Sequence, residues 1–149
     1  MPAPALAAAD WLPFFAGVIG AASGLGGSLL VLRSQRGQQR SARLAEAAGS
    51  FAERLGGTAD AVAYALRNPG DEEGVKNARW LVGELSLPLA RVKLFFGAHS
   101  DVISAAEKAV AQLRAAAADL RSEAAGPAYQ HARAAEEEFL ATARGVIER

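Results

Sequence analysis

The sequence predicts an all-α protein in which an N-terminal transmembrane helix continues into an antiparallel up-down bundle of about four helices. Three observations lead to this fold class. Alanine, the strongest helix former, supplies 36 of the 149 residues. Apolar residues recur three and four positions apart along most of the chain, and no run alternates with the period of two that is typical of a strand. An uncharged stretch of 22 residues lies near the N-terminus.

The uncharged stretch is predicted to span a membrane. It runs from Trp11 to Leu32 (WLPFFAGVIGAASGLGGSLLVL), and as a helix it would be about 33 Å long, enough to cross a hydrocarbon core of about 30 Å. A buried core helix and a cleaved signal peptide are the alternatives, but the preceding MPAPALAAAD lacks the basic residues of such signals. We therefore expect a short tail (1–10), a transmembrane helix (11–32), a basic juxtamembrane segment (33–43) and a helical bundle (44–149).

Basic residues directly after the span predict its orientation. Four arginines precede the first acidic residue there: Arg33, Arg36, Arg40 and Arg43. The positive-inside rule places the N-terminus outside the inner (cell) membrane and residues 33–149 in the cytoplasm. The arginines are spaced three, four and three apart, so they also form a stripe that could contact anionic lipid headgroups. A role in topology alone is the alternative.

Small residues share one face of the predicted span. They recur three or four positions apart: Ala16, Gly17, Gly20, Gly24, Gly27 and Ser28. Such a face lets two helix backbones approach closely in lipid, so we expect a homo-oligomer formed through it. The alternative is that glycine is simply common in transmembrane helices.

Beyond the span, each bundle helix is predicted from an apolar stripe and its end signals. The first helix carries Leu44, Ala48, Phe51, Leu55, Ala59, Val62 and Leu66, and it ends at Arg67 because Asn68-Pro69-Gly70 is a strong turn signal. The second begins with Asp71 as its N-cap. Its stripe continues to Gly97 through Val75, Ala78, Val82, Leu85, Leu89, Val92 and Phe96. Pro88 interrupts this second helix and predicts a kink or short break near Ser86.

Two further helices complete the predicted bundle. The third begins at Ser100 and carries Ile103, Ala106, Val110, Leu113, Ala117 and Leu120, with Gly126-Pro127 as its end. The last carries Tyr129, Ala132, Glu136, Phe139, Ala143 and Val146, with Leu140 and Ile147 widening the same face. Connections of about three residues leave no room for a crossover, so neighbouring helices are expected to be antiparallel.

Three large residues stand out on the second helix. Trp80 lies beside the stripe through Ala78 and Val82, and Leu94 and Phe95 make the end of the helix more apolar than one stripe requires. Core packing is the expected role of all three residues. A patch that binds a partner or the membrane surface is the alternative.

The residue inventory excludes several kinds of chemistry. The chain has no cysteine, which rules out disulfides and a thiol nucleophile. His99 and His131 lack carboxylates at metal-site spacing, and no HExxH, Walker A or EF-hand motif occurs. Zero formal net charge gives no support for nucleic-acid binding. We expect no catalytic residue, metal or cofactor, and we interpret the acidic run Glu136–Glu138 as a solvated helix face.

The layout as a whole resembles that of small single-pass membrane proteins of high-GC actinobacteria. The resemblance lies in the Gly- and Ala-rich span, the Arg- and Gln-rich stretch RSQRGQQRSAR and the Ala-rich helices that follow. Phage-encoded membrane proteins of similar size share the layout. The resemblance implies a membrane location and helical structure.

The function expected from these features is that of a non-enzymatic, membrane-tethered interaction or scaffold module. Its expected partners are membrane lipid, further copies of the chain and a protein not identified by the sequence. Two alternatives stay open. The chain could perturb membranes or act in lysis through larger oligomers of the Gly-rich span, or it could be a sensor-type domain if the topology is reversed.

Overall fold

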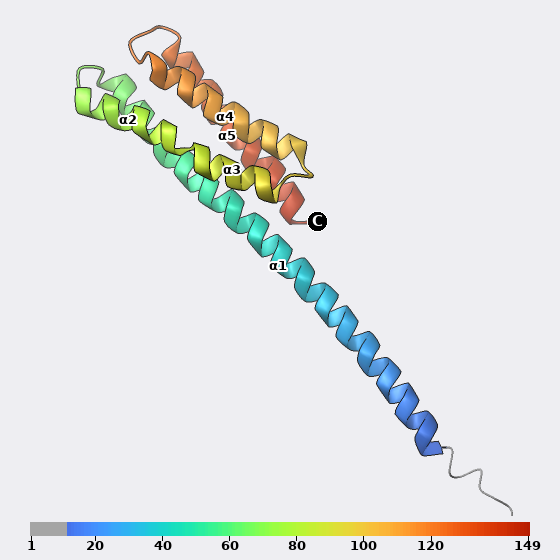
Figure 1. Ribbon diagram of the computed structural model, residues 1–149. Coiled ribbons are helices and arrows are strands. Elements are labelled where there is room, and N and C mark those ends of the chain that lie inside the picture. The colour runs from blue at the N-terminus through green and yellow to red at the C-terminus, as the bar shows by residue number, and fades with distance from the viewer. Residues whose placement is uncertain (1–11) are drawn as a thin grey trace, which may run out of the picture. The chain divides into compact units, whose positions relative to one another are not determined.

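The computed structural model describes the backbone of residues 12–149 and the side chains of residues 37–149. Within residues 12–149 the structure contains helices and no strand (Figure 1): α1 (Leu12–Arg67), α2 (Glu72–Glu84), α3 (Ser86–Phe95), α4 (Ser100–Ala118) and α5 (Ala125–Ile147). The chain divides into two compact units, residues 1–40 and 41–149, and the second unit contains the bundle. The predicted all-α class is confirmed.

The bundle part of α1 buries its predicted stripe and ends at the predicted turn. Six of the seven stripe residues are buried, and Leu66 is half-buried. The side-chain amide of Asn68 donates to the carbonyl of Tyr64 at 3.0 Å, and Nε of Arg67 donates to the carbonyl of Ala63 at 3.2 Å. The backbone N–H of Asn68 also donates to the carbonyl of Tyr64, at 2.9 Å, so main-chain and side-chain bonds together hold the last turn.

The N-terminus of α2 is capped by Asp71, as predicted. Oδ1 of Asp71 accepts the backbone N–H of Gly74 at 3.1 Å, and the first turn carries Glu72 and Glu73. The capping oxygen satisfies one of the orphan N–H groups, and the acids lie near the positive end of the helix dipole.

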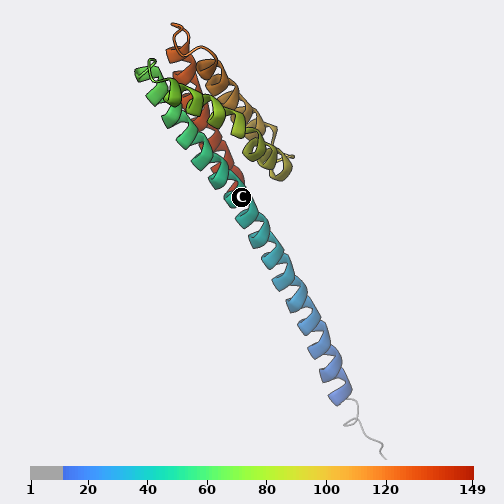
Figure 2. The same ribbon diagram turned by 60° about the vertical axis from the view of Figure 1, so that its left-hand side comes forward.

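Helices α2 and α3 together take the place of one bundle helix that is interrupted at Leu85 (Figures 1 and 2). Pro88 has no N–H to donate to the carbonyl of Glu84, and its ring crowds that carbonyl. Leu85 nevertheless keeps right-handed helical dihedrals (φ −64°, ψ −13°), and the N–H of Leu89 donates to its carbonyl at 3.1 Å. The predicted kink near Pro88 is therefore confirmed as a one-residue break.

Contacts between the helices show that neighbours are antiparallel. Arg79, early in α2, donates to the carbonyl of Ala117 at the end of α4, whereas Lys93, late in α3, pairs with Glu107 in the first half of α4. The chain therefore runs in opposite directions in α2–α3 and in α4. The up-down order predicted from the short connections is confirmed for these helices.

The core combines a few large aromatic rings with many alanines. Phe51 of α1 and Phe139 of α5 are fully buried and meet edge to face, with ring centroids 4.8 Å apart. Around them lie buried alanines of every bundle helix except α3, among them Ala59, Ala78 and Ala106. Small side chains at the contacts let the helix axes approach closely, so the bundle is held together with few bulky residues.

Three details of the helical prediction are wrong. Helix α4 ends at Ala118 because Asp119 leaves the helical dihedrals (φ −139°, ψ 84°), so Gly126-Pro127 does not end it. This pair lies in the first turn of α5, where the missing proline N–H has no helical partner to lose. Leu140 does not widen the core face of α5, because it is exposed. Helix α3 ends at Phe95, two residues before the predicted Gly97.

The predicted membrane span falls mostly outside what the structure describes. Its backbone belongs to α1 from Leu12 onward, while the side chains of the whole span, 11–32, and the tail, 1–10, lie outside the described residues. In the part of the chain with described side chains, no helix is long and apolar enough to cross a membrane.

Candidate interaction surface

The outer face of α2 and α3 carries most of the exposed large apolar side chains in the described part of the chain. Those exposed are Tyr64, Trp80, Leu87, Leu94, Phe95 and Leu140, and four of these belong to α2 or α3. Trp80, Leu87 and Leu94 are 62%, 73% and 77% exposed. They lie seven residues apart, which is two helical turns, so they share one side of α2–α3.

The expectation that Trp80, Leu94 and Phe95 pack in the core is wrong. Ala78 and Val82 face the core, and Trp80 lies about 200° of helical rotation from each of them, so it points outward. Phe96, directly after α3, is fully buried, while its neighbour Phe95 is 40% exposed. The three side chains are therefore available to a partner.

Small residues alternate with the large ones on this face. Gly83 and Ala90 are exposed and complete the spacing of three, four, three and four. A Cβ atom built on Gly83 would meet nothing within 4 Å. We call this row the α2–α3 seam: Trp80, Gly83, Leu87, Ala90 and Leu94. Its spacing is that of the a and d positions of a coiled coil, which normally lie against a second helix.

On the side of the seam that faces α4, the polar side chains are bonded within the bundle. Nε and Nη2 of Arg79 donate to the carbonyls of Ala117 and Ala118 at 3.0 and 3.1 Å. Nη2 of Arg114 donates to Oγ of Ser86 at 3.0 Å. Lys93 forms an ion pair with Glu107 of α4. This flank of the seam (Arg79, Ser86 and Lys93) is therefore tied to α4.

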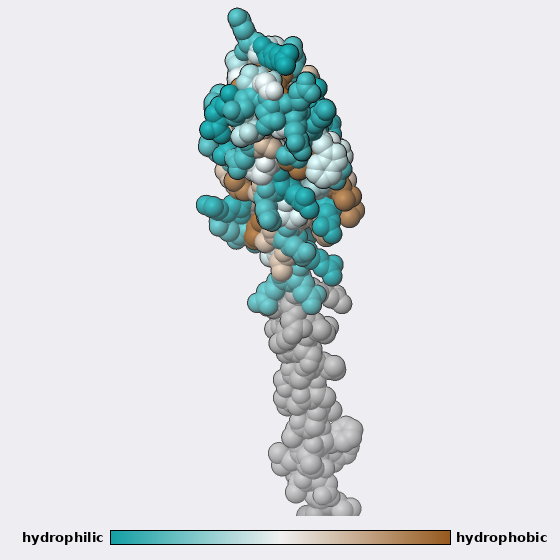
Figure 3. Space-filling view, turned by 90° about the vertical axis from the view of Figure 1, so that its left-hand side faces the viewer, coloured by the Kyte–Doolittle hydropathy of each residue, from teal (hydrophilic) through white to brown (hydrophobic). Residues whose placement is uncertain are grey.

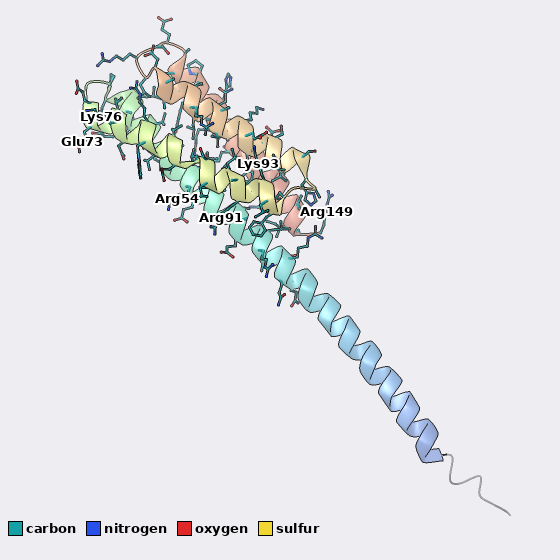
Figure 4. All side chains as sticks on the ribbon, in the orientation of Figure 1. Arg54, Glu73, Lys76, Arg91, Lys93 and Arg149 are labelled. Atoms are coloured by element: carbon teal, nitrogen blue, oxygen red, sulfur yellow. The ribbon has the colours of Figure 1, made fainter. Side chains whose placement is uncertain are left out.

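On the other side of the seam, an open groove of about 440 Å³ separates α2–α3 from α1. Glu84 and Arg91 line it from α2 and α3, and Glu53 and Arg54 line it from α1. Figure 4 shows Arg54 and Arg91 on the same side of the bundle. Among the residues with described side chains, neither Glu84 nor Arg91 has an ion-pair partner.

The surrounding surface is mainly hydrophilic. Figure 3 shows one face of the bundle, on which hydrophilic side chains predominate and hydrophobic ones form small separate patches. Exposed large apolar residues arranged in a regular row are unusual against this background.

A second cavity, of about 410 Å³, lies at the end of the bundle formed by the α1–α2 and α4–α5 connections. Its lining includes Arg79 and Arg121. Arg121 donates to the carbonyl of Pro69 at 3.4 Å, and its backbone N–H donates to Oδ1 of Asp119 at 3.2 Å. Arg121 therefore joins the two connections, while Arg79 joins α2 to the end of α4.

The acidic run on α5 is only partly solvated, which corrects the prediction for one of its members. The side chain of Glu136 is 12% exposed, and its Oε2 accepts from Nη1 of Arg133 at 2.6 Å. Burial raises the pKa of Glu136, the Arg133 guanidinium opposes this, and Asp60 and Glu137 add to the rise. The carboxylate lies beside Gly56 of α1, where a Cβ atom would be in ordinary van der Waals contact with Oε1 at 3.6 Å. Glu137 and Glu138 are exposed.

The remaining predicted site residues lie in or near the N-terminal unit. Arg40 and Arg43 are exposed. Arg33 and Arg36 and the small-residue face lie outside the residues with described side chains: Ala16, Gly17, Gly20, Gly24, Gly27 and Ser28.

The described residues hold no group of three or more His, Asp or Glu side chains that could bind a metal ion. His131 is exposed, and His99 packs edge-on near Phe96 with ring centroids 6.4 Å apart. Comparisons with protein-family models, with curated proteins and with solved structures found no match to this chain.

Proposed function

We propose that this chain is a non-enzymatic interaction module, tethered to the inner membrane through residues 11–32, that binds a helical partner on the α2–α3 seam. The observation that supports docking is the exposure of Trp80, Leu87 and Leu94 in a row with coiled-coil spacing. A helix of the partner would bury these side chains, and each fully buried leucine contributes about 1.5 to 3 kcal/mol.

The tether is supported by the uncharged length of residues 11–32 and by the arginines that follow it. An arginine in place of Ile19 would put a charge near the centre of the span, at a cost of about 2.5 to 3.5 kcal/mol for insertion. We expect Ile19→Arg to move the chain from the membrane pellet to the supernatant. The control Ala111→Arg, on an exposed position of α4, should stay in the pellet. An Ile19→Arg chain that stays with the membrane would refute the tether.

The orientation and the oligomer-forming face belong to the same proposal. A reporter fused after Arg149 should be active only in the cytoplasm, and activity on the outer side would reverse the topology and favour a sensor role. Gly20→Leu with Gly24→Leu should reduce self-association in lipid, because leucine side chains keep the helix backbones apart. Leakage of dye from vesicles that contain the wild-type chain would instead favour the membrane-perturbing alternative.

Docking on the seam is tested by crosslinking in membranes followed by purification in mild detergent. We expect Leu87→Glu to abolish the crosslinked complex while the helical circular dichroism signal stays unchanged. Leu140→Glu is the matched control, because Leu140 is also an exposed leucine but lies on α5. If the two variants behave alike, the seam is not the docking surface.

A further inference from the structure

We propose that the partner on the α2–α3 seam is a second copy of this chain, packed with its α2–α3 antiparallel to the first about a two-fold axis near Pro88. This inference rests on the proposed function, since it names the occupant of the same surface. A two-fold interface uses the same patch on both copies, so the patch must complement itself. The seam and its groove-side flank have this property.

The apolar residues of the seam complement themselves only in the antiparallel direction. In an antiparallel pair of helices, each a position faces a d position of the other helix. Leu87 then faces Ala90 of the second copy, and Leu94 faces its Gly83. Every leucine meets a small residue, which allows the helices to interdigitate closely. In a parallel pair leucine would face leucine and glycine would face glycine, so the helices would be held apart and leave gaps.

The charges next to the seam complement themselves in the same register. With Leu87 opposite Ala90, Glu84 of one copy lies opposite Arg91 of the other, and the two-fold axis repeats this pair. Neither side chain has an ion-pair partner among the described residues, although both line the groove. The opposite flank, with Arg79 and Lys93, is already bonded to α4 and needs no partner.

The balance of charge in the groove also favours a second copy over an anionic lipid surface. Glu53 and Glu84 offset Arg54 and Arg91 there. A membrane of anionic lipid would leave the two acids facing like charge, whereas a copy of the same surface offers both signs.

The break between α2 and α3 does not interrupt the seam. Leu85 keeps helical dihedrals, so α2 and α3 can present one continuous row to the partner.

The direction of packing is tested with single cysteines in the full-length chain, which has none of its own. One chain carries Glu84→Cys and the other, with a larger tag, carries Arg91→Cys; both are reconstituted together in lipid nanodiscs and treated with a short thiol crosslinker. We expect crosslinks between the two different chains and few between identical chains. In the proposed dimer the same position in the two copies, such as Glu84 and Glu84, lies about 10 Å apart along the helix axis. Self-crosslinking of each chain with no preference for mixed pairs would overturn the antiparallel arrangement. Absence of any crosslink would overturn the second copy as occupant.

The charge pair is tested by exchange. Glu84→Arg and Arg91→Glu should each weaken dimerisation of the full-length chain about tenfold or more, and the double variant should restore it because the exchanged pair forms again across the two-fold axis. Leu87→Glu should weaken it about thirtyfold, and the control Leu140→Glu should have no effect. These measurements use the Gly20→Leu and Gly24→Leu background, so that association through the predicted span does not hide the result. Single variants that dimerise like the parent would overturn the charge pairing.

These outcomes separate the occupant from the docking surface. If Leu87→Glu abolishes a crosslink to a different protein while no chain-to-chain crosslink forms in the wild type, the second copy is excluded and the seam remains a docking surface. If Leu87→Glu alters no crosslink of either kind, the proposed function fails together with this inference.

Discussion

The hydroxyl of Tyr64, in the last turn of α1, donates a hydrogen bond to Oδ2 of Asp71 at 3.1 Å, while Oδ1 of the same carboxylate caps α2. One side chain therefore joins the end of one helix to the start of the next, and it does so across the turn Asn68-Pro69-Gly70. The bond from the N–H of Gly74 lowers the pKa of Asp71, and the Tyr64 hydroxyl lowers it further.

Acid should weaken the folded state through Asp71. Because the folded pKa lies below the ordinary value of 3.8, the unfolded chain binds the proton more readily, and stability is lost as pH falls through the folded pKa. We expect Asp71→Ala to lower the urea midpoint at neutral pH and to reduce the loss of stability in acid. Tyr64→Phe should show a smaller effect in the same direction. Circular dichroism in urea at several pH values measures both, and an unchanged acid dependence in Asp71→Ala would contradict the prediction.

Two glycine positions should respond in opposite ways to alanine. Gly49 lies inside α1 with nothing within 4 Å of a built Cβ atom, so Gly49→Ala should stabilise the chain by about 0.5 to 1 kcal/mol. At Gly74 the added Cβ would lie 2.9 Å from both Oδ2 of Asp71 and Cε1 of Tyr64. Gly74→Ala should therefore displace the cap and destabilise the chain. Urea unfolding of both variants gives the comparison, and stabilisation by Gly74→Ala would show that the Tyr64–Asp71 contact is dispensable.

The stability of the folded chain should depend on pH through Glu136 in the direction opposite to that for Asp71. Its folded pKa lies above the ordinary value of 4.5 because it is buried beside α1, so the folded chain binds the proton more readily. Stability then falls as pH rises from about 4.5 through the folded pKa. Glu136→Gln should remove this fall and raise the urea midpoint at neutral pH, while the exposed neighbour Glu137→Gln serves as control. A lower midpoint for Glu136→Gln at pH 7 would mean that its bond to Arg133 outweighs the burial.

Arg79 should contribute to stability through the end of α4. Its guanidinium bonds the carbonyls of Ala117 and Ala118, which lack partners within that helix. We expect Arg79→Met, which keeps the apolar stem, to cost about 1 to 2 kcal/mol of unfolding free energy. Arg79→Lys should restore little, because an ammonium group lacks the planar fork that reaches both carbonyls. Arg144→Met, at an exposed position of α5, should change stability by less than about 0.5 kcal/mol.

Local signals in the sequence determined the helical class, the turn at Asn68-Pro69-Gly70, the cap at Asp71 and the break near Pro88. Each depends on backbone groups within about four residues, and such short-range physics is independent of the rest of the fold. The end of α4 was misplaced because Gly126-Pro127 suits either the end of one helix or the first turn of the next. Only the non-helical backbone at Asp119 resolves that choice.

Only the tertiary structure decided that the second apolar face of α2–α3 is left uncovered. The sequence predicted the stripe through Ala78, Val82 and Leu85 as the core face, and these residues are buried. Periodicity alone does not say whether Trp80, Leu87 and Leu94, on another side, are covered as well. The neighbouring helices pack against the alanine side, Arg79 and Lys93 on its flank bond to α4, and the tryptophan side stays exposed. Likewise, spacing along α5 placed Glu136 on the stripe that faces the core, but only the tertiary structure shows that its carboxylate lies beside Gly56 of α1 and pairs with Arg133.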